Sequence, residues 1–372
     1  MSFPVISADS HITEPPGTYV DHIDPAFVDR APRLQDCGPD IGDAFVVDGM
    51  ARPFSLGTVA AAGKAAEEIT AGGSRFADLH RGGWDPEARM DDQIRDGVTA
   101  EVIYPSIGMI LCNHPDLDYK RACFEAYNRW LAGYCAAHPD RLLGLGQTAM
   151  RSPDEGIADL ESIRALGLRG VMLPGEPGVE DYDSPAYDEF WAATVALGLP
   201  PSFHILTMRA GRTRGPKMNS FLSIVRGCQD ILGMLVLGGV FERTPALKVV
   251  CAEADAGWVP HFMYRLDHAY HRHRNWLPAG QELTRPPSAW FADNVYVTFQ
   301  DDWTAFRFAD DMNWRHLMWA NDFPHSDSTW PWSRELLDEQ TEQLSAEQKQ
   351  AILSGNVADL YGIDLVPLAD LV

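Results

Sequence analysis

The chain has 372 residues, of which 45% are hydrophobic and 10% aromatic, a composition that supplies a large buried core and excludes a wholly disordered protein. Lys and Arg total 30 against 53 Asp and Glu, and the resulting net charge of −23 argues against nucleic acid or an anionic membrane as a partner. No apolar run approaches the roughly 18 residues of a membrane span, and the opening MSFPVISADSH has no signal-peptide pattern. The six cysteines form no CxxC pair, so we expect reduced thiols in a cytoplasmic protein.

Short apolar runs alternate with helical patterns along the chain. A first strand is expected at 4–6, and an irregular stretch rich in Pro, Gly and Asp follows at 15–84. This stretch is too long for a simple connection, so we expect it to form an inserted cap or lid. Beyond it, the predicted strands are 100–104, 142–146, 170–173, 201–205, 247–252, 295–299 and 317–319. The predicted helices are 90–97, 116–138, 154–166, 185–197, 221–241 and 258–275, with further helices from Trp332 and Ala346.

Counting the first, these are eight strands, each followed by a helix or a long excursion. The alternation favours a parallel sheet covered by helices on both faces. Over this length, eight such units fit a closed (β/α)8 TIM barrel better than an open sheet. We therefore predict one α/β domain over residues 1–372, with 15–84 as its inserted cap. The sequence contains no GxSxG elbow and no phosphate-binding GxxxxGK[ST] loop.

Candidate metal ligands follow the predicted strands at their carboxyl ends, where TIM barrels place their chemistry. Asp9 and His11 stand two residues apart after the first strand, so their side chains point to the same side. His204 ends the fifth strand, and Asp322 follows the eighth. Any one of these is more often a turn or cap residue than a ligand. Two imidazoles and two carboxylates at one barrel mouth nevertheless predict a divalent metal site.

This arrangement resembles the amidohydrolase-2 family, which includes aminocarboxymuconate-semialdehyde decarboxylase. The resemblance rests on DxH after the first strand, His after the fifth and the run DFPHSDS at 322–328, and it extends over 5–362. The stretches EADAGWVP at 253–260 and RLD at 265–267 look like an actinobacterial branch, and the chain is also similar to the nonheme diiron hydroxylase of the platensimycin pathway. The resemblance implies a metal-dependent TIM barrel whose metal ligands are Asp9, His11, His204 and Asp322.

One departure from the family pattern concerns the sixth strand. Better-known members place a histidine there, whereas this chain has Glu253. The oxygen-rich ligand set suits iron or manganese better than zinc, and carboxylates can bridge two metals. We therefore predict two irons per chain, with zinc or manganese as the alternative. Glu253 is predicted as a further metal ligand that bridges to the second iron, and Glu253 and Asp322 as catalytic residues. In the alternative, Glu253 binds no metal and pairs with the charge of Arg265 or His261. His268, on the histidine-rich helix, is a further predicted metal ligand.

The loop after the fifth strand is basic although the chain as a whole is acidic. It is either a solvated loop that neutralises acidic neighbours or an anion-binding rim for a carboxylate, a phosphate or a coenzyme A tail. Aromatic residues near the strand ends suit an apolar substrate body, although such residues more often serve packing. The predicted substrate-binding residues are Arg209, Arg212, Arg214, Trp303, Phe323 and His325.

Two enzymatic functions fit these residues. In the first, one metal activates water or polarises a substrate for hydrolysis or non-oxidative decarboxylation. In the second, a carboxylate-bridged iron pair activates dioxygen and hydroxylates a hydrophobic small molecule of secondary metabolism, such as a terpenoid acyl-coenzyme A. The carboxylate-rich set and the basic loop favour the second, which is the sequence-based prediction, and a homodimer is expected. A barrel that binds ligands without catalysis is the third alternative.

Overall fold

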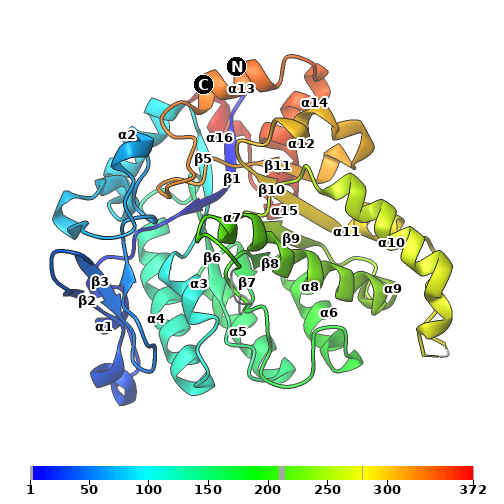
Figure 1. The fold of residues 1–372 in the computed structure, drawn as a ribbon, viewed down its shortest axis with the longest axis horizontal. Helices are drawn as coiled ribbons and strands as arrows, with labels where there is room; N and C mark the ends of the chain where they lie inside the picture. The colour runs from blue at the N-terminus through cyan, green and yellow to red at the C-terminus, as the bar shows by residue number, and fades with distance from the viewer. Residues whose placement is uncertain (1–2, 209–213, 279, 372) are drawn as a thin grey trace.

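The computed structural model describes residues 3–208, 214–278 and 280–371. Within these residues, eight parallel strands stand side by side in the order in which they occur along the chain. All eight predicted strands are confirmed, and with them the TIM barrel (Figure 1). The strands are β1 (Ile6–His11), β5 (Ala100–Tyr104), β6 (Leu142–Gln147), β7 (Gly170–Met172), β8 (Pro201–His204), β9 (Val249–Ala252), β10 (Val295–Phe299) and β11 (Leu317–Trp319).

The barrel nearly closes where β1 meets the end of β11. The backbone N–H of Asp322 donates to the carbonyl of Asp9 (3.0 Å), and that of His11 donates to the carbonyl of Phe323 (2.6 Å). Strand β1 begins later than the sequence predicts and continues through His11. Asp9 and His11 therefore lie within the strand, and the seam brings them beside Asp322.

Helices surround the sheet (Figure 1), and most of the predicted ones form with small shifts at their ends. Asp116 and Ser152 cap the starts of α4 and α5 by accepting hydrogen bonds from backbone N–H groups. The helix predicted at 221–241 is divided into three, and Gly239, with a φ of +74°, separates the second piece from the third. The helices outside 15–84 are α2 (Pro86–Asp96), α3 (Ile107–Leu111), α4 (Leu117–Cys135), α5 (Pro153–Ala165), α6 (Asp188–Leu197), α7 (Asn219–Ser223), α8 (Val225–Leu237), α9 (Val240–Arg243), α10 (Val259–His273), α11 (Pro287–Asn294), α12 (Trp303–Arg307), α13 (Ser333–Gln340), α14 (Ala346–Gln350), α15 (Asn356–Tyr361) and α16 (Val366–Ala369).

The segment 15–84 has elements of its own. It contains the short helix α1 (Gly17–Val20) and an antiparallel sheet of β2 (Arg33–Asp36), β3 (Asp43–Val46) and β4 (Phe54–Ser55). Backbone hydrogen bonds join this segment to the loop after β11: the N–H of Ala61 donates to the carbonyl of Pro324, and the N–H of Ser326 donates to the carbonyl of Thr58. The segment therefore packs at the carboxyl ends of the barrel strands; its action as a cap or lid stays a prediction.

One segment, Asn219–Leu237, is long and apolar enough by composition to cross a membrane, with a mean hydropathy of 1.4. In the structure it forms α7 and α8, and Leu232 and Leu235 of α8 are packed in the barrel core. Of the apolar window 28% is buried, and one such helix by itself is weak evidence of a membrane span. The six cysteines are free thiols; the predicted cytoplasmic location and homodimer stay predictions.

Candidate metal centre

Buried imidazoles and carboxylates from different strands come together at the carboxyl end of the barrel. Their candidate donor atoms lie within 4.8 Å of one another in two overlapping groups. The predicted ligands on β1, at the end of β8 and after β11 are all present, and Glu253 after β9 belongs to both groups. The first group is Asp9, His11, His204 and Glu253, and the second is His11, Glu253, Asp322 and His325.

The spacing of these donor atoms suits one central cation. His11 Nε2 lies 3.4 Å from Asp9 Oδ1, 3.4 Å from Asp322 Oδ1 and 3.2 Å from Glu253 Oε2. His204 Nε2 lies 3.6 Å from Asp9 Oδ1 and 3.1 Å from Glu253 Oε2. Ligands that stand about 2.0–2.2 Å from an ion lie roughly 3.0–3.6 Å from one another in tetrahedral or octahedral geometry. The observed separations fall in that range.

Hydrogen bonds on the far side of two imidazoles fix which nitrogen faces the centre. His11 Nδ1 lies 3.0 Å from the carbonyl of Pro105, and His204 Nδ1 lies 2.9 Å from the carbonyl of Ile205. A carbonyl only accepts, so each Nδ1 carries a hydrogen and donates it. In the neutral ring Nε2 then presents a lone pair to Glu253 Oε2, which is itself an acceptor. Two acceptor atoms this close repel each other unless a proton or a metal ion lies between them.

His325 joins the centre through a different support. Ser106 Oγ donates its hydrogen to the carbonyl of Ile12 (2.7 Å), so it accepts from His325 Nε2 at 2.8 Å. The other ring nitrogen, Nδ1, then faces Asp322 Oδ1 at 3.1 Å. The His325 ring also stacks on His11 with centroids 3.7 Å apart. His325, predicted as a substrate-binding residue, is thus placed as a candidate metal donor.

Several donor atoms at the centre are buried with no hydrogen-bond partner among the described residues. These are Asp9 Oδ1, His204 Nε2 and both carboxylate oxygens of Asp322. All three side chains are fully buried, and each unpaired buried polar group costs about 1–3 kcal/mol. A divalent cation would satisfy all of them at once, so the residues present fit a metal ion.

The close charges at the centre shift the pKa values of its side chains. Burial lowers the pKa of His204, but the charges of Asp9 and Glu253 outweigh it and raise this pKa well above its usual value. Burial raises the pKa of Glu253, but His204 and His11 outweigh it and hold this pKa well below its usual value. The carboxylates thus attract positive charge, which protons or a metal can provide, and metal binding releases those protons.

The backbone conformation and hydrogen bonds from a neighbouring strand hold the carboxylates in place. Glu253 and Asp322 both have a φ of +53°, a left-handed conformation that costs roughly 1–2 kcal/mol in a residue with a Cβ. Thr298 on β10 links two of the acidic residues, because its Oγ1 accepts from the N–H of Glu253 (2.9 Å) and donates to Asp9 Oδ2 (2.9 Å). Sequence reasoning missed Thr298 and Ser106, since nothing in the local pattern marks either.

Other predicted site residues do not reach the centre. His268 is exposed on α10, with its ring against Tyr264 (centroids 5.7 Å apart). Its side chain is on the outer face of that helix, so the predicted ligand role is not supported by its position. Glu253, for its part, contacts His11 and His204, and not Arg265 or His261 as the alternative reading had it.

The predicted substrate contacts are scattered. Phe323 is buried and packs under the Arg89 guanidinium, 4.4 Å from its ring centroid, so it serves packing. Trp303, the first residue of α12, is 56% exposed, and Arg214 is exposed. Arg209 and Arg212 lie outside the described residues, so the contact with a coenzyme A tail stays a prediction.

The chain is similar in sequence to a known family and to enzymes within it. The family described as Amidohydrolase matches residues 9–363. The chain is 24% identical over 303 residues to 2-amino-3-carboxymuconate-6-semialdehyde decarboxylase of Dictyostelium discoideum, covering 78% of this chain and 80% of that one. It is 26% identical over 227 residues to gamma-resorcylate decarboxylase of Rhodococcus jostii, covering 53% and 64%.

Solved structures show the same fold. An amidohydrolase of Mycobacterium avium subsp. paratuberculosis superimposes with a TM-score of 0.81 at 19% identity, covering 97% of this chain and 100% of that one. A 5-carboxyvanillate decarboxylase of Novosphingobium aromaticivorans with bound manganese gives 0.71 at 17% identity, covering 97% of each chain.

These comparisons correct the predicted reaction. The prediction of a diiron hydroxylase that uses dioxygen is wrong, because the related enzymes are decarboxylases. A divalent metal is supported by the cluster and by the manganese in a structural neighbour, whereas a pair of irons is not. The oxygen-rich ligand set misled the prediction, since carboxylate ligands are compatible with non-redox metals as well.

Proposed function

Because this chain belongs to the amidohydrolase family, we propose that it is a metal-dependent, non-oxidative decarboxylase of a small aromatic carboxylic acid. The observation that carries the proposal is the buried centre, where lone pairs of imidazoles and carboxylates converge without hydrogen-bond partners among the described residues. The related decarboxylases, which act on carboxylated compounds, support the substrate class.

Asp9, His11, His204 and Asp322 would hold the ion, with Glu253 beside them. Imidazole and carboxylate donors together suit manganese or zinc. The ion would supply a positive charge that binds and polarises the carboxylate of the substrate. The backbone carbonyls of Pro105 and Ile205 orient the two imidazoles for this purpose.

The protein's own residues must also manage one proton. Decarboxylation breaks the bond between the ring carbon and the carboxyl carbon, CO2 leaves, and the electron pair left on the ring carbon takes up a proton. We assign this proton transfer to Asp322. Burial, together with the charges of Glu253 and Asp9, raises the pKa of Asp322 well above its usual value. The lone pair of His325 Nδ1 faces Asp322 Oδ1 at 3.1 Å, so Oδ1 is the oxygen whose proton is held in a hydrogen bond, and solvent recharges it after the transfer.

Carbon dioxide release tests the proposal. Manganese-loaded protein is incubated with 2,6-dihydroxybenzoate and with 5-carboxyvanillate, and CO2 and the decarboxylated phenol are measured. We expect turnover of at least one acid, with kcat reduced by about a thousandfold or more in Asp322→Asn. The matched control is Asp338→Asn on the exposed face of α13, which should leave kcat unchanged. Hydrolysis of an ester or amide without CO2 release from any aromatic acid would overturn the proposal in favour of a hydrolase.

A further inference from the structure

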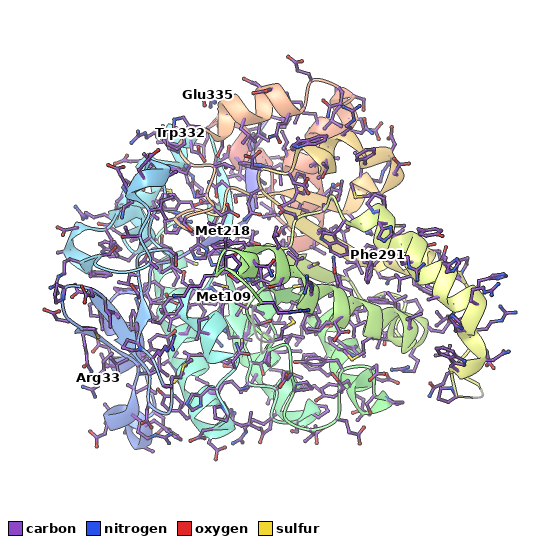
Figure 2. The ribbon with its side chains drawn as sticks, viewed as in Figure 1. Arg33, Met109, Met218, Phe291, Trp332 and Glu335 are labelled. Carbon is purple, nitrogen blue, oxygen red and sulfur yellow. The ribbon has the colours of Figure 1, made fainter. Side chains whose placement is uncertain are left out.

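A second cavity lies at the opposite end of the barrel from the metal centre. Its volume is about 350 Å³, and its lining includes Val5 and Thr99, which immediately precede β1 and β5. The metal centre, in contrast, lies where the strands end. The cavity also borders the start of α13, beside both chain termini at the upper edge of the molecule (Figure 1). Trp332 and Glu335, labelled in Figure 2, flank this part of α13.

The wall of the cavity is mostly apolar but carries two arginines. Arg141 is partly buried, and its Nε donates to the carbonyl of Thr99 (2.9 Å). Arg334 extends from α13 to Gly97 at the end of α2, so closely that a Cβ on Gly97 would lie 2.5 Å from the guanidinium. The apolar lining residues are Phe3, Val5, Ile94, Val98, Trp319, Leu337 and Leu371.

Neither arginine has an anionic partner within the part of the chain that the structure describes. Other arginines of this protein, such as Arg89, Arg243 and Arg315, each contact a carboxylate. Burial lowers the pKa of Arg141, although the charge of Glu101 opposes this shift.

The one acidic side chain that lines the cavity is already committed elsewhere. Asp96 accepts hydrogen bonds from Asn321 Nδ2 (3.0 Å) and from the N–H (3.1 Å) and hydroxyl (2.7 Å) of Ser333. Two guanidinium charges against one carboxylate leave an excess of one positive charge in the cavity. A single negative charge on an incoming molecule would balance it.

We propose that this cavity binds a small monoanion with an apolar body, an aliphatic or aromatic carboxylate. Its carboxylate would accept charge-assisted hydrogen bonds from Arg334 and Arg141, and its body would lie against Val98, Trp319 and Leu337. The site is separate from the metal centre and does not depend on the reaction catalysed there. Its volume falls at the lower end of ligand pockets, which excludes coenzyme A thioesters and other large anions.

Calorimetric titration of octanoate and of benzoate into the metal-loaded protein tests the site. We expect saturable one-to-one binding of at least one of them. Arg334→Glu, an exposed position that tolerates substitution, should weaken that binding by about tenfold or more, because it replaces an attraction with a repulsion. Arg272→Glu on the exposed surface of α10 changes the net charge equally and should bind as the wild type does.

A second variant addresses the apolar wall. Ile94 is 68% exposed at the rim of the cavity, so Ile94→Glu should fold normally and should weaken binding by a similar factor. Equal binding in Arg334→Glu and Arg272→Glu, or no saturable binding by the wild type, would overturn the proposal. Binding that survives Arg334→Glu but disappears in His204→Ala would place the carboxylate at the metal centre and would overturn it as well.

Discussion

Two buried clusters of charged side chains lie next to each other at the seam of the barrel: the ion pair of Arg89 with Glu101, and the candidate metal centre. Only in the ion pair do the positive and negative charges of the side chains cancel. Arg89 and Glu101 form two hydrogen bonds, from Nε (2.6 Å) and Nη2 (3.1 Å), and Arg89 Nη1 reaches the carbonyl of His11 (2.8 Å). In the metal centre, Asp9 and Asp322 keep oxygens without a hydrogen-bond partner among the described residues. In a structural ion pair the protein supplies every hydrogen-bond partner of the buried charges. In a metal centre some buried donor atoms have no partner from the protein and can bind the ion.

The largest expected effect breaks the open cluster. His204→Ala removes a nitrogen whose lone pair no other side chain replaces, so metal content should fall well below one ion per chain and CO2 release should fall about a thousandfold or more. Far-ultraviolet circular dichroism should stay unchanged, since the barrel does not depend on this ring. His138→Ala, at the surface against Glu87, is the control. Full metal content in His204→Ala would contradict the assignment.

The next prediction breaks the closed cluster. Arg89→Met leaves Glu101 buried without its counter-charge, and the free energy of unfolding should fall by about 3–5 kcal/mol. Metal content per folded chain should stay near that of the wild type, because Arg89 touches the backbone of His11 and not its ring. Denaturant titration with metal analysis measures both. The double variant Arg89→Met with Glu101→Leu should recover much of the loss; a single-variant loss below about 1 kcal/mol would contradict this account.

A third buried carboxyl sharpens the comparison, because no cationic side chain among the described residues contacts it. Glu14 is fully buried, and its Oε1 accepts from the N–H groups of Ser106, Ile107 and Gly108 at the start of α3. Burial raises the pKa of Glu14 from 4.5 to about 7. Backbone donors alone therefore do not compensate for the burial of this carboxyl.

The raised pKa gives a pH dependence with a definite sign. Between pH 4.5 and about 7 the unfolded chain has lost the Glu14 proton and the folded chain has kept it, so this group makes stability fall as pH rises. The fall amounts to about 3 kcal/mol and levels off above pH 7. Glu14→Gln keeps the acceptor oxygen and removes the titration. Denaturant titrations at pH 5 and pH 8 should show the variant gaining on the wild type at pH 8; equal differences at both values would contradict the prediction.

Local sequence pattern was sufficient for the strands and for five of the six residues that the candidate centre brings together. Alternation along β1 places Asp9 and His11 on one side, and the carboxyl ends of parallel strands gather His204 and Asp322 at one end of the barrel. The supports of these ligands could not be predicted. Thr298 and Ser106 act through hydrogen bonds to residues that are distant in sequence, and such pairs leave no periodic signal.

The residue types at the centre also did not predict which reaction the metal supports. Imidazoles and carboxylates predict that a divalent ion binds, but the same donors suit metals that activate dioxygen and metals that only polarise a substrate. Glu253 in place of a histidine therefore could not decide between hydroxylation and decarboxylation. The related decarboxylases contradict hydroxylation and support decarboxylation.

The smallest expected effect concerns a histidine that belongs to neither cluster. Successive side chains of a helix diverge by about 100°, so α10 can direct few of its histidines to the barrel, and His268 is exposed beside Tyr264. His268→Ala should leave metal content unchanged and alter the free energy of unfolding by no more than about 0.5 kcal/mol. His325→Ala is the informative counterpart, because its ring stacks on His11 and faces Asp322, and it should lower metal affinity by about tenfold or more. Equal metal affinities for the two variants would remove His325 from the centre, and a loss in His268→Ala alone would restore the ligand predicted from sequence.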